Sequence, residues 1–122
     1  MTRVASERAR SATAVDNAVF SRLVADLGAE HIEELCRVFL ENAALCVDAV
    51  RGALDAGDGP GAAKAAHRLK SSSGFVGATK LVDLCTEVEA GSGNPGDALA
   101  AALRRTSFEL HVLVGRAAAG TS

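Results

Sequence analysis

A histidine and a lysine lie one helical turn apart in the segment Ala65–Ala78. Successive residues of an α-helix turn by about 100°, so that residues three and four apart share a face. His67, Lys70 and Ser71 therefore lie on one face of a predicted helix. The opposite face is a nearly apolar stripe made of Ala62, Ala66, Leu69, Ser73 and Val76. If this stripe is buried, the imidazole of His67 is held in water.

These residue types suit phosphoryl transfer. A neutral imidazole is a nucleophile, and an imidazole with the usual pKa of about 6.5 is mostly neutral near pH 7. Attack on a phosphoryl group leaves about two negative charges on the product, which the ammonium of Lys70 would balance. Ser71 and Gly74 are small and leave room for the active site of a second protein. The alternative is an ordinary surface histidine beside a solvated lysine.

A longer run around His67 resembles the histidine-containing phosphotransfer (HPt) domain family. The family pattern is Ala-His-x-Leu-Lys-Gly-Ser-Ser/Ala, then Gly-Ala, then Leu-x-x-Leu-Cys and a late Glu. The matching residues are Ala66-His67-Arg68-Leu69-Lys70-Ser71-Ser72-Ser73, then Gly77-Ala78, Leu81, Leu84-Cys85 and Glu89. The chain departs from the pattern at Ser71, where the family usually has glycine. This hydroxyl narrows the approach to the ring and is able to bond the ring or a phosphoryl group.

The resemblance implies a phosphorelay intermediate of two-component signal transduction. His67 would be the phosphoacceptor, forming phosphohistidine through its Nε2 atom, and Lys70 would balance the phosphoryl charge. Histidine kinases instead resemble His-Glu-Leu-Arg-x-Pro, whereas Arg68 follows His67 here. The sequence also holds no Gly-rich phosphate cradle, so we expect a phosphotransfer module without an ATP site or autokinase activity.

The family resemblance also implies the partners. These are response-regulator receiver domains and a hybrid histidine kinase, and the receiver supplies the Mg²⁺ while this domain holds no cofactor of its own. The family's docking mode predicts an apolar patch with a polar rim beside His67 and Lys70. Its predicted residues are Leu23, Leu27, His31, Leu35, Lys64, Arg68 and Gly74.

The composition of the 122-residue chain favours a single all-α domain in the cytoplasm. The net charge of −2 provides no basic excess for nucleic-acid binding. The sequence contains neither an apolar run long enough to span a bilayer nor a secretory signal. Cys36, Cys46 and Cys85 are an odd number without a Cys-x-x-Cys motif, which favours reduced core cysteines over disulfides or structural zinc.

Turn residues divide the chain into helices. Residues 1–15 lack a clear period and are predicted to be a disordered tail. Asp16 would cap a short helix that ends at Gly28, and a long helix would follow from Ala29 to about Ala56. Further helices are predicted from about Gly61 to Gly74 or Phe75, from Ala78 onward, and after a cap at Asp97. The predicted buried stripe of the long helix consists of Ile32, Leu35, Phe39, Cys46, Ala49 and Ala53.

These elements predict an antiparallel up-down-up-down four-helix bundle with the short N-terminal helix across one end. The HPt domain would span residues 16–118, and residues 119–122 would fray. His31 is expected at the rim of the docking surface and His111 on the flank of the last helix. No Glu-x-x-His motif or convergent ligand set predicts a metal site.

Two other functions fit the same sequence. One is a non-phosphorylated helical adaptor that binds receiver or kinase domains, and the other is a structural bundle or homodimer. We expect a monomer.

Overall fold

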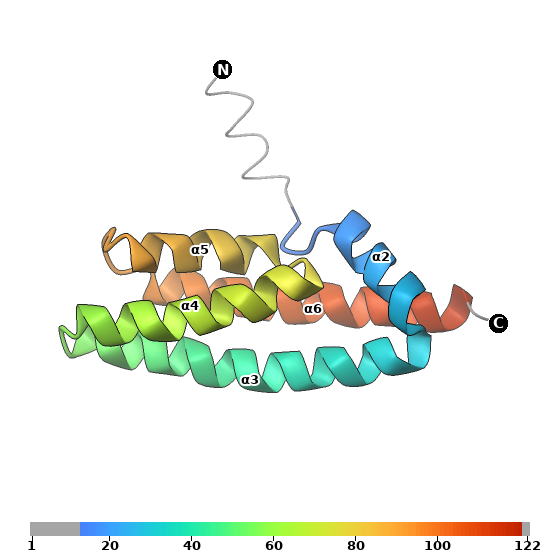
Figure 1. Ribbon diagram of the computed structural model, residues 1–122, viewed down its shortest axis with the longest axis horizontal. Helices are drawn as coiled ribbons and strands as arrows, with labels where there is room; N and C mark the ends of the chain where they lie inside the picture. Colours follow the sequence, from blue (N-terminus) through green and yellow to red (C-terminus); the bar gives the residue numbers. More distant parts are fainter. Residues whose placement is uncertain (1–12, 121–122) are drawn as a thin grey trace, which may run out of the picture.

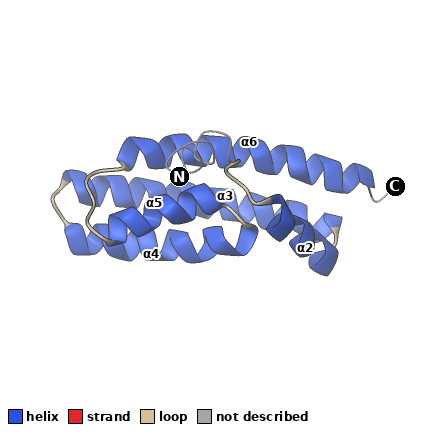
Figure 2. Cartoon of the chain, turned by 90° about the horizontal axis from the view of Figure 1, so that it is seen from above, coloured by secondary structure: helices blue, strands red, loops and turns tan. Residues whose placement is uncertain are grey.

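The computed structural model describes residues 13–120, and this part of the chain is all-helical. Its helices are α2 (Asn17–Leu27), α3 (Ala29–Asp55), α4 (Gly59–Val76), α5 (Thr79–Glu89) and α6 (Gly96–Gly120). Figure 2 shows helices and connecting loops, with no strand between residues 13 and 120. The predicted all-α class is therefore confirmed.

The short helix α2 has the predicted limits. The side chain of Asp16 accepts hydrogen bonds from the amides of Ala18 and Val19, which satisfies free donors at the helix start. Gly28 ends α2 with a φ of 88°, a value that favours glycine. The next helix, α3, begins at the following residue.

The long helix α3 buries a different stripe from the predicted one. Ile32 and Phe39 are buried as expected, but the full buried set is Ile32, Cys36, Phe39, Ala43, Val47 and Val50. Ala49 is exposed, and Cys46 is only partly buried. The predicted stripe assumes a slightly wrong helical period. Over 27 residues this error accumulates, so the later residues of the predicted stripe do not face the core.

Helix α4 starts two residues earlier than predicted. The carboxylate of Asp58 accepts a hydrogen bond from the amide of Gly61, and Pro60 lies in the first turn, where its missing N–H is not needed. The predicted buried stripe of this helix is confirmed at every position. The helix ends at Gly77, whose φ of 84° is left-handed, so the chain turns there and not at Gly74.

The last helix begins one residue before its predicted cap. Asp97 lies in the first turn of α6 and pairs with Arg51 of α3 at 3.1 Å. The side chain of Asn94 accepts a hydrogen bond from the amide of Gly96 just before it. Helix α6 continues to Gly120, so residues 119 and 120, predicted to fray, are helical. Residues 121 and 122 lie outside the described part.

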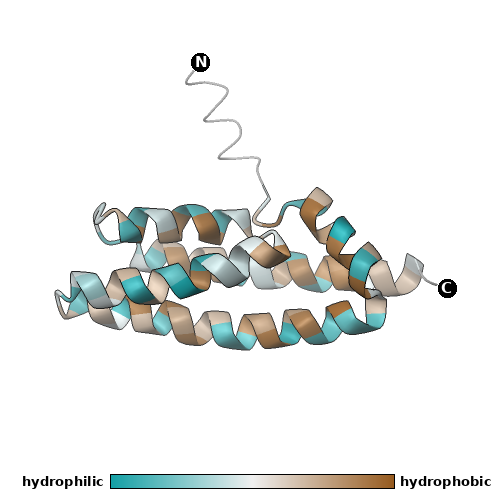
Figure 3. Ribbon diagram, viewed as in Figure 1, coloured by the Kyte–Doolittle hydropathy of each residue, from teal (hydrophilic) through white to brown (hydrophobic). Residues whose placement is uncertain are grey.

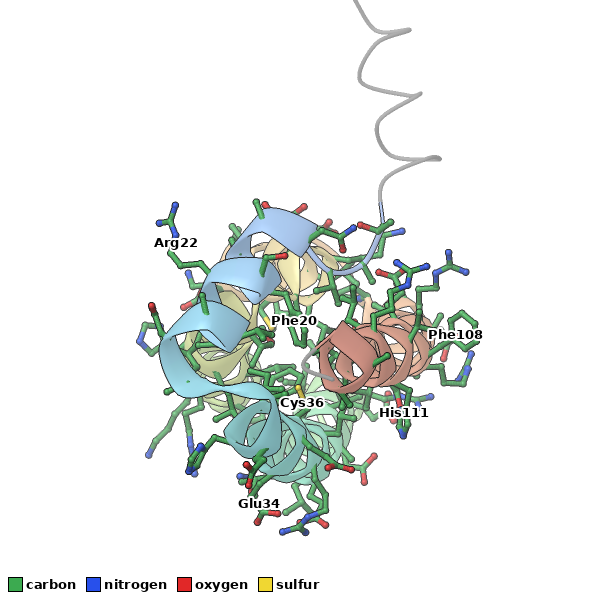
Figure 4. The ribbon with its side chains drawn as sticks, turned by 90° about the vertical axis from the view of Figure 1, so that its right-hand side faces the viewer. Phe20, Arg22, Glu34, Cys36, Phe108 and His111 are labelled. Atoms are coloured by element: carbon green, nitrogen blue, oxygen red, sulfur yellow. The ribbon has the colours of Figure 1, made fainter. Side chains whose placement is uncertain are left out.

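The helices pack around one apolar core. Helix α4 packs against α3 and α5, α6 packs against the same two helices, and α2 packs on α3 and α4 (Figure 1). Seen from the end of the bundle, Phe20 and Cys36 point into the interior, whereas Arg22 and Glu34 point into solvent (Figure 4). None of the helices in residues 13–120 is long and apolar enough to cross a membrane.

The packed domain begins before residue 16. Ala14 and Val15, which fall in the predicted disordered tail, are fully buried. The carboxylate of Glu109 on α6 accepts hydrogen bonds from the amides of Ala14 and Val15, at 3.0 and 2.9 Å. The amide of Asp16 donates to the carbonyl of Gly77 at 2.7 Å. These contacts are long-range in sequence, which is why no local pattern predicts them. Residues 1–12 of the predicted tail lie outside the described part.

The contact between Glu109 and residues 14 and 15 is expected to stabilise the fold. Burial alone would raise the pKa of Glu109, but the Ala14 amide, Arg105 and the Val15 amide together lower it below its usual range. We expect Glu109→Gln to reduce the free energy of unfolding by about 1–3 kcal/mol, because an amide group replaces one acceptor oxygen with a donor. Urea denaturation at pH 7 measures this loss.

The pH dependence follows from the lowered pKa of Glu109. Its contribution is complete above the unfolded pKa of about 4.3 and disappears as pH falls through the lower folded pKa. The stability difference between wild type and Glu109→Gln should therefore shrink in acid. Glu87→Gln, at an exposed acid of α5, is the control and should change stability little. Equal stability of Glu109→Gln and wild type at pH 7 would contradict the prediction.

Candidate functional site

The candidate site is on the outer face of α4. His67 lies near the middle of this helix, and its side chain is 67% exposed. The buried stripe of α4 packs into the core on the opposite side, so the ring is presented to solvent as expected. In Figure 3 the central part of α4 includes residues in the hydrophilic colour. The backbone around His67 is held in place by the bundle, while the ring itself is accessible.

Glu89 of α5 holds both His67 and Lys70. Its Oε2 atom lies 3.0 Å from Nδ1 of His67, and its Oε1 atom lies 2.5 Å from Nζ of Lys70. The turn at Gly77 brings the end of α5 back alongside α4, so that one carboxylate reaches two side chains of the neighbouring helix. Lys70 therefore already has a partner beside the imidazole.

The contact with Glu89 determines which ring nitrogen is available. The hydrogen bond from Lys70 and, next, that from His67 lower the pKa of Glu89, so its carboxylate is ionised near neutral pH. An ionised carboxylate only accepts hydrogen bonds. Nδ1 of His67 must then carry the proton and donate it, and in the neutral ring Nε2 keeps its lone pair. Of the two ring nitrogens, Nε2 is therefore the one with a free lone pair.

Ser71 does not bond the imidazole. Its hydroxyl donates to the backbone carbonyl of His67, at 3.3 Å, within the same helix. The possible bond from Ser71 to the ring is thus not formed in this structure. Ser71 is exposed, and a Cβ built on Gly74 would meet nothing within 4 Å. The outer face of α4 is thus open at Gly74, two turns along the helix from His67.

The predicted docking residues are only partly available. Lys64, Arg68, Gly74, Leu27 and His31 are exposed. Leu35 is partly buried and packs against the core. Leu23 is wrong as a docking residue, because its side chain is 8% exposed and belongs to the core. It falls on the face by which α2 packs on the bundle.

The other candidate groups lie outside the site. His31 and His111 are exposed, and Nδ1 of each contacts the carbonyl four residues earlier in the chain, Leu27 or Ser107. Burial raises the pKa of Cys36 to about 11 and, with a smaller effect from Glu89, that of Cys85 to about 12. These thiols stay protonated and are not nucleophiles at pH 7. Within residues 13–120, no group of three or more His, Cys, Asp or Glu side chains is placed to hold a metal ion.

The sequence reasoning missed the role of one residue of the site. Glu89 was recognised as part of the family pattern, but no role followed from it, because its contact with His67 joins residues 22 positions apart. The sequence did contain one indication of this role, because Glu89 lies at the end of the helix that is predicted to follow the turn at Gly77.

The fold and the site together define a small helical-bundle domain with a solvent-exposed histidine fixed by a carboxylate. Comparison with protein families identifies this class. The family model of the Hpt domain matches residues 34–116, which include His67, Lys70 and Glu89. The chain belongs to the Hpt domain family, and its family membership implies histidine phosphotransfer in two-component signalling. A search of curated proteins and a search of solved structures found no match to the chain.

Proposed function

We propose that this chain accepts a phosphoryl group on Nε2 of His67 from a receiver-domain aspartate and passes it to a second receiver. The observation that carries this proposal is the hydrogen bond between Nδ1 of His67 and the ionised carboxylate of Glu89. It leaves an exposed imidazole with its lone pair on the outer nitrogen. Membership in the Hpt family supports the same chemistry.

The transfer step balances without a further reactant. The Nε2 lone pair attacks the phosphorus of the aspartyl phosphate, an N–P bond forms, and the P–O bond to the aspartate breaks. The aspartate leaves as a carboxylate with the electron pair. The ring gains positive charge while Nδ1 keeps its proton, and the carboxylate of Glu89 stabilises that charge. Transfer to the second receiver is the reverse reaction with a new aspartate.

Lys70 is proposed to balance the charge of the phosphoryl group. Its ammonium is held by Glu89 beside the imidazole, so a short movement suffices to share it with a phosphoryl group on Nε2. Receiver-bound Mg²⁺ would neutralise the group during transfer. In this proposal the receiver supplies the metal ion and this domain supplies the nucleophile.

Lys70→Ala should slow phosphorylation of His67 and shorten the life of the phosphohistidine. Removing the cation leaves the phosphoryl charge beside the carboxylate of Glu89 without compensation. We expect a change of about ten-fold in each rate. Time courses of radiolabel transfer from a phosphorylated receiver, and of label loss after its removal, measure both rates. Lys80→Ala, at a lysine of α5 outside the predicted docking residues, is the control, and equal kinetics of Lys70→Ala and wild type would remove the proposed role.

The order of the helices, the partners, the oligomeric state and the cellular location are also proposals. We propose the antiparallel up-down-up-down order for α3 to α6, which the colour sequence along the helices in Figure 1 supports, with α2 across one end. The partners would be response-regulator receivers and a hybrid kinase, contacted by a monomer. Three free cysteines, two of them buried, support a cytoplasmic location.

The chemical stability of the label tests the proposal against the adaptor function. The purified chain is incubated with a panel of phosphorylated receiver domains, and the label on it is treated with acid and with base. Phosphohistidine is acid-labile and base-stable, whereas phosphoserine is not. Receivers that bind the chain without transferring label would instead support the non-phosphorylated adaptor.

A further inference from the structure

An aromatic ring is exposed on the same helix as the phosphoacceptor. Phe75 is 56% exposed to solvent, although a large apolar side chain gains free energy from burial. His67, Ser71 and Phe75 follow each other at intervals of four residues, so they form one row on the outer face of α4. Ser71 is opposite the buried stripe, and Phe75 lies about 12 Å along the helix from His67.

The two rings border a notch, which we define by His67, Ser71, Gly74 and Phe75. Ser71 is small, and its hydroxyl is directed back to the carbonyl of His67. Gly74 has no side chain, and the space around it is open. The floor of the notch is therefore low, with the imidazole at one end and the phenyl ring at the other.

Helix α2 packs against α4, and it reaches the turn at Gly77 that ends α4. Val19, which is partly exposed, packs against Gly77, two residues after Phe75. Its Cβ lies 3.0 Å from the position that a Cβ on Gly77 would occupy. Helix α2 therefore covers the turn that follows Phe75.

The charges that α4 itself contributes beside the notch are positive, and one of them, Lys70, is paired with Glu89 of α5. Helix α4 contains Lys64, Arg68 and Lys70 and no acidic residue, although the whole chain has a net charge of −2. Complementarity of charge favours a partner with an acidic surface around an apolar depression. A receiver domain that presents an aspartyl phosphate among carboxylates has this chemistry.

We infer that Phe75 is the apolar anchor that determines which receiver domain docks on α4. The inference rests on the proposed function. A standard interface covers about 800 Å² per partner, a patch with a radius of about 16 Å, so a receiver centred on Nε2 of His67 also covers Phe75. The phenyl ring enters an apolar depression of the receiver, and the notch admits the backbone that carries the phosphoaspartate. Buried aromatic side chains of this kind contribute most of the energy of many interfaces.

Phe108 offers a matched control for Phe75. It is 63% exposed but projects from α6, on the side of the bundle away from α4 (Figure 4). Both phenylalanines are replaced by alanine, and circular dichroism checks that each variant is folded. Transfer from each phosphorylated receiver of a panel is then measured over a range of receiver concentrations.

Phe75→Ala should raise the half-saturating concentration of the preferred receiver about ten-fold, with less than a two-fold change in the rate at saturation. The preference for this receiver over the others should shrink by a similar factor. Phe75→Leu should recover most of the loss, and Phe108→Ala should behave as wild type. Half-saturation of Phe75→Ala within two-fold of wild type would overturn the inference, as would an equal loss in Phe108→Ala.

A small phosphodonor separates this inference from the proposed function. Phosphoramidate needs no docking surface, so it should label His67 equally in wild type and Phe75→Ala. A wild-type chain that no receiver labels overturns both the proposed function and the inference. A wild-type chain that receivers label, with unchanged half-saturation in Phe75→Ala, overturns the inference alone.

Discussion

His67→Gln abolishes acid-labile phosphorylation of the chain by a phosphorylated receiver. Glutamine has an amide in place of the imidazole and supplies no nitrogen lone pair able to attack phosphorus. The side chain of His67 is largely exposed and lies on a regular helix, and glutamine is a good helix former. The variant is therefore expected to keep the helical circular dichroism signal while losing the label completely.

The other two histidines provide controls for His67→Gln. His31 and His111 are also exposed, but a backbone carbonyl, and not a carboxylate, contacts Nδ1 of each. His31→Gln and His111→Gln should accept the same amount of label as wild type in a receiver-dependent assay at saturation. Label that persists on folded His67→Gln would place the phosphoacceptor elsewhere in the chain.

Replacement of Glu89 should give the second largest loss of transfer. Glu89→Ala removes the acceptor of the Nδ1 proton, so the ring is free to rotate and to place its proton on either nitrogen. It also releases Lys70. Partners that orient metal-ligating histidines contribute about 10- to 100-fold to activity. By analogy we expect a decrease of about ten-fold or more in the single-turnover rate at saturating receiver.

A second substitution at Glu89 separates orientation from charge. In Glu89→Gln the amide oxygen still accepts the Nδ1 proton, but the negative charge that stabilises the phosphorylated ring is lost. The rate should fall between those of wild type and Glu89→Ala. Glu87→Ala, at the exposed acid two residues earlier on α5, should transfer normally. Wild-type rates in Glu89→Ala would show that Nδ1 needs no partner.

The pKa of Glu89 sets the sign of the pH dependence. Because the folded pKa is below the usual value, the carboxylate stays ionised, and the Nδ1 bond stays intact, throughout the neutral range. The negative charge of Glu89 is lost only as pH falls through this lowered pKa. Glu89→Gln should therefore be slower than wild type at neutral pH, and this difference should shrink when wild-type Glu89 becomes protonated in acid.

The parts of the fold that were predicted correctly depend on local patterns. Asp16 and Gly28 limit α2 by local capping, and the short stripe of α4 keeps its period over few turns. In α3 the error in the period accumulates along the helix, so Ala49 was placed in the core and Val47 was not. Val15 was assigned to a tail because its burial depends on Glu109, 94 residues away.

The same distinction explains the site. His67 and Lys70 are one turn apart, so helical geometry alone places them on one face. The role of Glu89 depends on how α5 returns along α4 after Gly77, and no spacing within one helix contains this information. Leu23 was proposed for docking because periodicity identifies an apolar face without showing whether that face packs inward or outward. The fold assigns that face of α2 to the core.

Because His67 lies near the middle of α4, its ability to accept a phosphoryl group should depend on the cooperative unfolding of the whole domain. Thermal opening begins at helix ends, whereas interior segments of a small bundle exchange their amide hydrogens only when the whole domain opens. The anchor of the ring, Glu89, is the last residue of α5, but its pairing with Lys70 ties that end to α4, and α5 packs on both α4 and α6. Competence for transfer should therefore disappear in the same sharp transition as the helical signal, and a mutation far from α4 that lowers the melting temperature should shift both curves equally.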